Sequence, residues 1–368
     1  SGLRAQVIDA SVSSPDTIRA FDRSNYMEAR WSAATNSIYT LSRYIWDRQN
    51  RIQSAIRGAT ALLTVIIISV GALLVVDGQL DVGAMIGANI LAARALMPIV
   101  GLSQQVDGWV RAGQARRSLA DFVQIPRERK SGTAINKYSG NIEVKNMTFT
   151  YPNLGLTLID EINFSVNAGE VLCISGRNSS GKTTLAKLLT GLLDPSKGQI
   201  LAGGIDLQQI APDWWRQQIM YLPQEPYFMN GSIRENFNAF NPDLTAQEIR
   251  KLLVDVGLES LADESPGGLD QPVGKAGANF SLGVRRRLAL ARALSHDGPL
   301  AILDEPTEGI DAIGASYVYR IMNDMVSNGK TIIACSHDRE IIRGAHLFLD
   351  LDERPRPIIK DISKNDIP

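Results

Sequence analysis

The chain has 368 residues, of which 44% are apolar and 21% are charged, and its formal net charge is −1. This composition excludes wholesale disorder, and the near-zero net charge gives no reason to expect nucleic acid as a partner. The length leaves room for two or three domains of about 150 residues each.

Residues 58–76 form an apolar run of 19 positions without a charge. As a helix, this run would be about 28 Å long, close to the roughly 30 Å hydrocarbon core of a bilayer. After an acidic turn at 77–81, a weaker apolar stretch extends from 82 to about 106. A buried core helix of a soluble domain is the alternative for the first run, but such runs in soluble cores are usually shorter. The pattern favours two membrane spans joined by a short turn.

Arginines flank the two apolar stretches on the side away from the turn: Arg48, Arg51, Arg57, Arg111, Arg116 and Arg117. The turn itself contains no Lys or Arg, so both outer flanks are predicted to be cytoplasmic and the turn external. Arg94 lies inside the second stretch, where a charge is costly in lipid. It either faces a polar cavity or a partner helix, or reaches the interface from a tilted helix.

Residues 126–139 are polar, contain Pro126 and Gly132, and are predicted to be a linker. From 140 onward, short β-type runs alternate with helical stretches, which predicts an α/β domain up to about 355. The remaining residues, 356–368, are predicted to be a tail.

A glycine-rich motif follows the strand expected at 170–175 and opens a helix. It reads Gly176, Arg177, Asn178, Ser179, Ser180, Gly181, Lys182 and Thr183, a full match to GxxxxGK[ST]. Glycines in such a loop let backbone N–H groups turn toward phosphate oxygens, and the helix N-terminus adds partial positive charge. Lys182 is expected to reach the β- and γ-phosphates and Thr183 to hold Mg²⁺. Kinases, GTPases and many ATPases share this motif, so the motif alone does not show to which of these classes the protein belongs.

A pair of acidic residues narrows the class of nucleotide-binding protein. The apolar strand LAIL ends in Asp304 and Glu305, which predicts that Asp304 lies beside the metal and that Glu305 polarises an attacking water. The alternative is an acidic strand end that caps the next helix. His337 follows a third apolar strand and fits a γ-phosphate contact, although a lone histidine is more often structural.

Together these motifs resemble those of the ATP-binding cassette (ABC) exporters, and the resemblance covers essentially residues 1–350. It implies a half-unit of such an exporter. Residues 1–125 correspond to the C-terminal part of the transmembrane domain, with a coupling helix at about 20–31 and the fifth and sixth transmembrane helices at 58–76 and 82–106. A complete nucleotide-binding domain follows at 140–355. The implied fold class is an α/β P-loop ATPase domain, with a mixed sheet and a helical subdomain, preceded by α-helical transmembrane segments.

The resemblance also assigns roles to individual residues. Tyr151 stands where the family has an aromatic residue that stacks on adenine, and Gln224 where a glutamine contacts both Mg²⁺ and the transmembrane domain. Catalytic roles are implied for Glu305, His337 and Gln224. Metal ligation is implied for Thr183, Gln224 and Asp304. The residues expected to bind ATP are Tyr151, Gly176, Asn178, Ser179, Ser180, Gly181, Lys182, Thr183, Thr184, Ser281, Gly283 and Asp311.

The signature segment departs from the family pattern LSGGQ and reads FSLGV at 280–284. By the resemblance, Ser281 still supplies a hydroxyl, and Gly283 still lets the backbone come close to the γ-phosphate of the opposite subunit's ATP. Leu282 replaces a glycine, and its Cβ restricts the backbone. Two interpretations remain: tolerated drift, or a site at which hydrolysis is slowed.

The resemblance implies ATP-driven export, with ATP hydrolysis in a head-to-tail dimer of nucleotide-binding domains, and ATP and Mg²⁺ as ligands. The cassette is most similar to bacterial type I secretion and peptide exporters, so a protein or peptide is the expected substrate. Expected partners are a second half-unit, identical or different, membrane lipid and a membrane-fusion protein, with the nucleotide-binding domain on the cytoplasmic side of a bacterial inner membrane. The alternatives are a non-hydrolysing ATP-binding regulatory subunit and a soluble ABC ATPase of DNA repair or translation.

Overall fold

The computed structural model describes residues 8, 11–12, 15–124, 128–129, 131–134, 137–152, 155–263, 267–352, 357 and 359–362. The chain divides into two compact units, residues 1–126 and residues 127–368. Each unit is described by itself.

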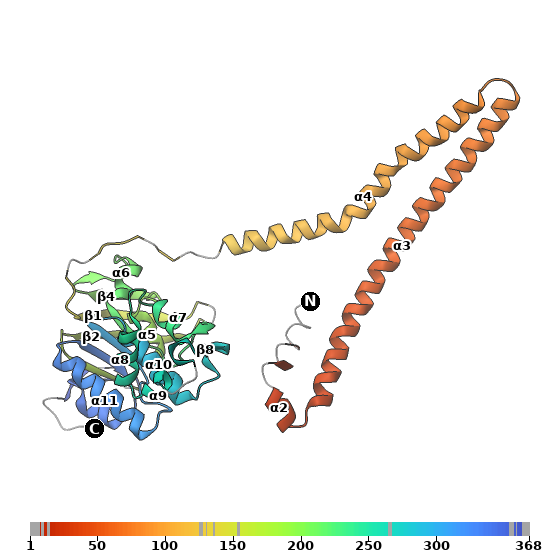
Figure 1. Ribbon diagram of the computed structural model, residues 1–368. Helices are drawn as coiled ribbons and strands as arrows, with labels where there is room; N and C mark the ends of the chain where they lie inside the picture. Colours follow the sequence, from red (N-terminus) through yellow and green to blue (C-terminus); the bar gives the residue numbers. More distant parts are fainter. Residues whose placement is uncertain are drawn as a thin grey trace. The chain divides into compact units, whose positions relative to one another are not determined.

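The first unit consists of helices (Figure 1). The short helix α2 (Pro15–Ala20) precedes two long helices, α3 (Ser24–Val76) and α4 (Val82–Val123), which are joined by the acidic turn. Gly71 brings α3 close to α4, because a Cβ on Gly71 would lie 2.5 Å from the Cγ atom of Met85. The Asp81 side chain caps α4 by accepting a hydrogen bond from the Gly83 N–H at 2.9 Å.

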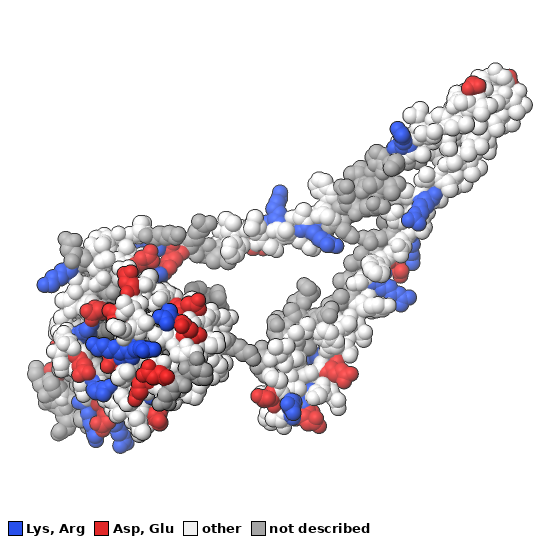
Figure 2. All heavy atoms as spheres, viewed as in Figure 1, with Lys and Arg blue, Asp and Glu red and all other residues white. Residues whose placement is uncertain are grey.

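The apolar part of this hairpin lies next to the turn. Within α3, residues Ser42–Val76 are long and apolar enough to cross a membrane, and Val82–Ala95 of α4 form a shorter apolar segment. Figure 2 shows few charged side chains on the hairpin near the turn, with acidic atoms at its tip. Both predicted spans are parts of longer continuous helices. In α4 the side chains of residues 96–107 lie outside the described part of the chain.

The segment at about 20–31 that is expected to be a coupling helix is not one continuous helix. Helix α2 ends at Ala20, and α3 begins only at Ser24. Between them the Arg23 N–H donates to the Ile18 carbonyl at 2.9 Å, and Asp22 has a left-handed φ of 48°. This is the backbone geometry that ends a helix, and aspartate tolerates it better than most residues.

The second unit is built on two main sheets. A six-stranded sheet has the order β12-β11-β3-β10-β9-β6, and a four-stranded antiparallel sheet has the order β2-β1-β4-β5. The first contains β12 (Ile359–Asp361), β11 (Leu347–Asp350), β3 (Val171–Ser175), β10 (Thr331–Cys335), β9 (Leu300–Asp304) and β6 (Ile219–Leu222). The second contains β2 (Thr157–Val166), β1 (Ile142–Thr150), β4 (Lys197–Ala202) and β5 (Ile205–Asp206). In the six-stranded sheet only β12 is antiparallel to its neighbour.

Helices surround these sheets. They are α5 (Lys182–Leu189), α6 (Pro212–Gln217), α7 (Ile233–Asn238), α8 (Ala246–Asp255), α9 (Glu259–Asp263), α10 (Leu282–Leu294), α11 (Ala312–Ser327) and α12 (Arg339–Gly344). Helices α7 to α10, with the small ribbon of β7 (Gly231–Ser232) and β8 (Pro272–Val273), form the helical subdomain. The expected fold class is therefore confirmed.

The parallel strands β3, β9 and β10 position the site. They are buried along almost their whole length, as expected for apolar strands covered by helices on both faces. Because neighbouring parallel strands end at the same edge, Ser175, Asp304 and Cys335 lie together at the carboxyl edge of the sheet. The three segments that follow these residues therefore meet there, which is where ligands bind in open α/β sheets.

Residues on both sides of the predicted domain 140–355 pair with it. Within the expected linker 126–139, Thr133 pairs with Ile210, and the ring of Tyr138 is buried against Trp214 and Trp215. Within the expected tail 356–368, β12 extends the six-stranded sheet. The folded unit thus begins before 140 and continues past 355, because non-local pairing orders segments whose composition resembles a loop.

Candidate nucleotide site

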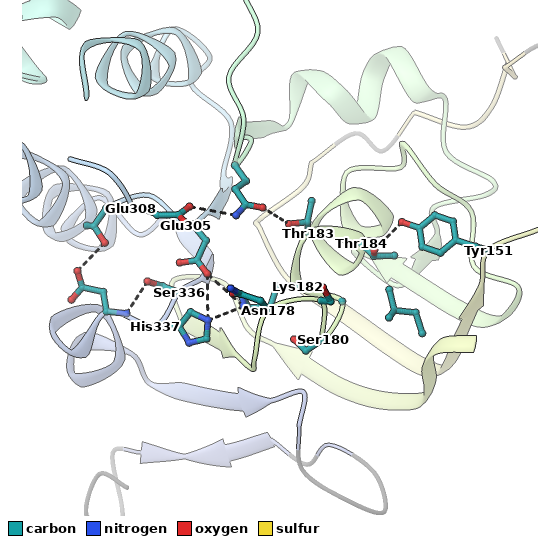
Figure 3. A pocket seen from close by; sticks show the side chains of 16 residues that line it. Tyr151, Asn178, Ser180, Lys182, Thr183, Thr184, Glu305, Glu308, Ser336 and His337 are labelled. Carbon is teal, nitrogen blue, oxygen red and sulfur yellow. Dashed lines mark hydrogen bonds and ion pairs between the residues drawn. The ribbon is translucent and has the colours of Figure 1, made fainter. Parts of the chain in front are cut away.

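A cleft of about 740 Å³ lies at the carboxyl edge of the six-stranded sheet (Figure 3). Its lining includes most residues that the sequence motifs singled out. They are Tyr151, Asn178, Ser179, Ser180, Gly181, Lys182, Thr183, Thr184, Gln224, Glu305 and His337, together with Leu158, Thr307, Glu308, Ser336 and Asp338.

The loop between β3 and α5 adopts a conformation that few residues other than glycine tolerate. Gly176 has φ 143° and Gly181 has φ 109°, and Ser179 between them also has a positive φ of 67°. A Cβ on Gly176 would lie 2.6 Å from the Ser180 hydroxyl oxygen. Successive turns of this kind form an anion-binding concavity of backbone N–H groups, which here opens at the N-terminus of α5.

Three motifs meet at the ammonium group of Lys182. Its Nζ atom donates to the Gly176 carbonyl at 2.6 Å and lies 3.5 Å from the Glu305 carboxylate. It is also 2.8 Å from Nε2 of His337, which accepts this hydrogen bond because an ammonium group can only donate. His337 Nε2 and Glu305 are 3.7 Å apart. The structure thus brings together the cation, the carboxylate and the imidazole that were predicted to surround the γ-phosphate.

Glu305 is held in a strained conformation. Its φ is 49°, and its backbone N–H donates to the Cys335 carbonyl at 2.8 Å, which ties it to the strand preceding His337. A left-handed glutamate is energetically costly, and such residues are concentrated at functional sites. Its side chain is 11% exposed, so the carboxylate faces the cleft with limited hydration.

The residues predicted to hold Mg²⁺ also converge. The Thr183 hydroxyl donates to Oε1 of Gln224 at 3.1 Å. Both carboxylate oxygens of Asp304 are buried without a hydrogen-bond partner among the described residues. Burial raises the pKa of Asp304, and the nearby Glu305 carboxylate raises it further, against the effects of the Thr183 hydroxyl and Lys182. A divalent cation would satisfy these oxygens, and a hydroxyl, an amide oxygen and a carboxylate are ligands that suit Mg²⁺. The residues present therefore fit this metal.

Tyr151 lies at the rim of the cleft. Its hydroxyl is 3.0 Å from the Thr184 hydroxyl, and its ring meets Phe149 edge to face at 4.9 Å between centroids. These contacts hold the ring beside the glycine-rich loop, and its stacking on adenine stays a prediction.

We expect Tyr151→Ala to weaken ATP binding by about tenfold, taking base–aromatic stacking at roughly 1–3 kcal/mol as a guide. Tyr151→Phe keeps the ring and removes only the hydroxyl, so it is expected to bind ATP nearly as well as the wild type. Titration calorimetry on both variants measures this. Equal losses in the two variants would assign the effect to the Thr184 contact rather than to stacking.

Ser281, Gly283 and Asp311 do not line the cleft of their own chain. Ser281 caps α10 by accepting from the Val284 N–H at 3.3 Å, and Asp311 caps α11 by accepting from the Gly314 N–H at 2.8 Å. Leu282 is 44% exposed, and its Cδ2 atom lies 2.9 Å from where a Cβ on Gly309 would be.

Several residues of the site were not predicted from the sequence. Glu308 accepts a hydrogen bond from Nε2 of Gln224 at 3.3 Å. Thr307 donates to Asp338 at 2.8 Å and so links the segment after β9 to the segment after β10. A sequence signal did exist for these residues, because each lies within three positions of a predicted site residue, but nothing in the sequence showed which neighbours face inward.

Comparison with known proteins gives matches to both parts of the chain. Residues 159–308 match the family model described as ABC transporter, and residues 2–99 match the model described as ABC transporter transmembrane region. Among solved structures, a bacterial Atm1-family ABC exporter with ATP bound has a TM-score of 0.84, with 21% identity, 95% of this chain covered and 62% of that chain covered. This likeness shows the fold.

Two curated relatives are translocation ATP-binding proteins by name. The toxin RTX-I translocation ATP-binding protein of Actinobacillus pleuropneumoniae is 28% identical over 344 residues, which is 93% of this chain and 48% of the relative. The alpha-hemolysin translocation ATP-binding protein HlyB of Escherichia coli O6:H1 is 32% identical over 293 residues, which is 79% of this chain and 41% of the relative. The chain thus spans about half the length of these curated relatives.

Proposed function

Because the chain belongs to the ABC transporters, with a transmembrane region followed by an ATP-binding domain, we propose that it is part of an exporter that couples ATP hydrolysis to transport. The observation that carries the proposal is the meeting of Lys182, Glu305 and His337 at one point of the cleft. A P-loop protein that only bound nucleotide would not need a carboxylate and an imidazole at the γ-phosphate position.

The geometry supports a hydrolytic mechanism. Lys182 and the N–H groups of the glycine-rich loop bind the β- and γ-phosphates, and Tyr151 orients the base. Thr183, Gln224 and Asp304 would hold Mg²⁺, which when bound neutralises charge on the phosphate oxygens. Glu305 polarises the attacking water, and its strained backbone keeps the carboxylate aimed into the cleft. His337, now facing Lys182, contacts the transferring phosphoryl group once ATP separates the two side chains.

The signature segment supports a dimer of half-units. Ser281, Gly283 and Asp311 do not reach their own chain's cleft, and we propose that in a head-to-tail dimer they complete the ATP site of the second half-unit. Closure around two ATP molecules and reopening after hydrolysis then move the transmembrane helices. The membrane-region match at residues 2–99 opposes the alternative of a soluble ABC ATPase.

Cross-linking tests the dimer directly. We expect full-length Asn178→Cys and Ser281→Cys copies, mixed in the presence of ATP and an oxidant, to form a disulfide-linked dimer. Neither variant alone is expected to form it, and the native cysteines are buried and do not interfere. The readout is a non-reducing gel. ATP-bound dimers that show no cross-link would contradict the head-to-tail arrangement.

For the substrate we propose a protein, exported across a bacterial inner membrane, with the ATP-binding domain in the cytoplasm. The support is the similarity to relatives whose names refer to translocation of toxin and hemolysin. A membrane-fusion protein is the further partner proposed on the same ground. Copurification of such a protein with the full-length exporter tests this part of the proposal.

A further inference from the structure

Helix α10 rests on the turn that follows Glu305, and the contact is made by a buried arginine. Arg286 is only 8% exposed, and its Nη1 atom donates to the backbone carbonyls of both Glu305, at 3.3 Å, and Glu308. Its Nη2 atom forms an ion pair with the Glu308 carboxylate at 3.0 Å. The Arg286 side chain of α10 therefore binds both ends of the turn at residues 305–308, which begins with the proposed water-activating residue Glu305.

Glu308 continues this contact to the proposed metal site. The carboxylate oxygen that pairs with Arg286 also accepts from Nε2 of Gln224 at 3.3 Å (Figure 3). Gln224 in turn accepts from the Thr183 hydroxyl through its other amide atom, at 3.1 Å. The hydrogen bond from Arg286 lowers the pKa of Glu308 and keeps it ionised. A continuous chain of polar contacts thus runs from α10 through Glu308 and Gln224 to Thr183.

Two features make this contact more than a structural ion pair. Glu305 keeps its left-handed φ of 49° only if its surroundings hold it there, and Arg286 is bonded to its carbonyl. Leu282, one turn before Arg286 on the same face of α10, packs against Gly309, which has φ 68°. The strained turn is therefore held by the first two turns of α10, the helix that Ser281 caps and whose second residue is Gly283.

We infer that Arg286 and Glu308 are positioning residues for ATP hydrolysis. Arg286 fixes the backbone of Glu305, and Glu308 fixes the amide of Gln224 so that its oxygen faces the metal. The inference rests on the proposed function and extends it, because the N-terminus of α10 is the part assigned to the ATP of the second half-unit. Movement of α10 on docking to that ATP is transmitted by Arg286 to this chain's own Glu305.

The test compares four single variants and one double variant of the full-length protein in lipid vesicles. Arg286→Met removes the charge and the donors but keeps an apolar stem. Arg286→Lys keeps the cation, and Glu308→Gln keeps the shape of the glutamate without its charge. Arg287→Met is the matched control, because Arg287 is next to Arg286 on α10 but donates to the Gly257 carbonyl in the helical subdomain.

We expect Arg286→Met to lower kcat by about tenfold or more, since a small displacement of a reacting group is enough, while the Kd for ATP stays within about twofold of wild type. Arg286→Lys is expected to recover part of the loss, and Arg287→Met to stay within about twofold of wild type in kcat. Glu308→Gln is expected to lower kcat and to raise the Mg²⁺ concentration that gives half-maximal rate. The double variant Arg286→Met with Glu308→Gln is expected to lose little more than Arg286→Met alone, because the two residues act as a unit.

Wild-type kcat in Arg286→Met would overturn the inference. A parallel loss of ATP affinity and thermal stability in Arg286→Met would also overturn it, because Arg286 would then act in folding rather than in positioning. Additive effects in the double variant would overturn it as well. If the wild-type protein binds Mg²⁺-ATP without hydrolysing it, the proposed function fails and this inference fails with it. Wild-type hydrolysis combined with an unaffected Arg286→Met variant overturns only the inference.

Discussion

Glu305→Gln is expected to leave ATP binding unchanged and to lower hydrolysis by about 100-fold or more, the scale of a lost general base. The amide keeps the size and the buried position of the carboxylate, but it cannot polarise water to the same degree. It also removes a negative charge 3.5 Å from Lys182, so binding of the anionic nucleotide is not expected to suffer. Phosphate release and ATP affinity, measured on the same full-length preparation, check both halves of this prediction.

The matched control for this variant is Glu259→Gln, an exposed glutamate at the start of α9. It is expected to hydrolyse ATP at the wild-type rate. A second consequence is that Glu305→Gln accumulates as an ATP-bound closed dimer, visible as a shift in size on gel filtration. Hydrolysis at the wild-type rate in Glu305→Gln would remove Glu305 from its assigned role.

Lys182→Ala is expected to weaken ATP binding itself. The ammonium group makes the charge-assisted contact to the β- and γ-phosphates, worth about 1.5–3 kcal/mol, or roughly 10- to 100-fold in affinity. The loss affects the ground state as well as the transition state, which distinguishes this variant from Glu305→Gln. Calorimetric titration with ATP gives the change in Kd.

Lys197→Ala provides the control, because Lys197 is an exposed lysine on β4 outside the cleft. It is expected to bind ATP as the wild type does. An unchanged ATP affinity in Lys182→Ala would count against the phosphate-binding role of the whole glycine-rich loop, since Lys182 is the cation at its centre.

The parts of the site that could be predicted from the sequence are those in which spacing along the chain determines the geometry. Gly176 to Thr183 act within one strand–loop–helix unit. Asp304 and Glu305 follow directly after a buried strand, as His337 does after the strand beside it. Because parallel strands end at one edge, these short motifs meet at one place without further information.

Other features depended on contacts between distant segments. The contact of Arg286 with Glu308 joins residues on different elements, and no local pattern shows that this arginine, rather than Arg285 or Arg287, points inward. The strand at 359–361 looks like a polar tail until it pairs with β11. The break at 21–23 depends on the left-handed backbone of Asp22, which the sequence does not distinguish from a helical aspartate.

Phosphate release from Mg²⁺-ATP by the full-length wild-type protein in lipid vesicles, measured beside Glu305→Gln, tests the proposed ATP hydrolysis most directly. We expect steady Mg²⁺-dependent hydrolysis by the wild type and almost none by the variant, with equal ATP binding by both. A wild-type protein that binds ATP, forms dimers and yet releases phosphate no faster than Glu305→Gln would contradict this expectation and would indicate a regulatory ATP-binding subunit instead.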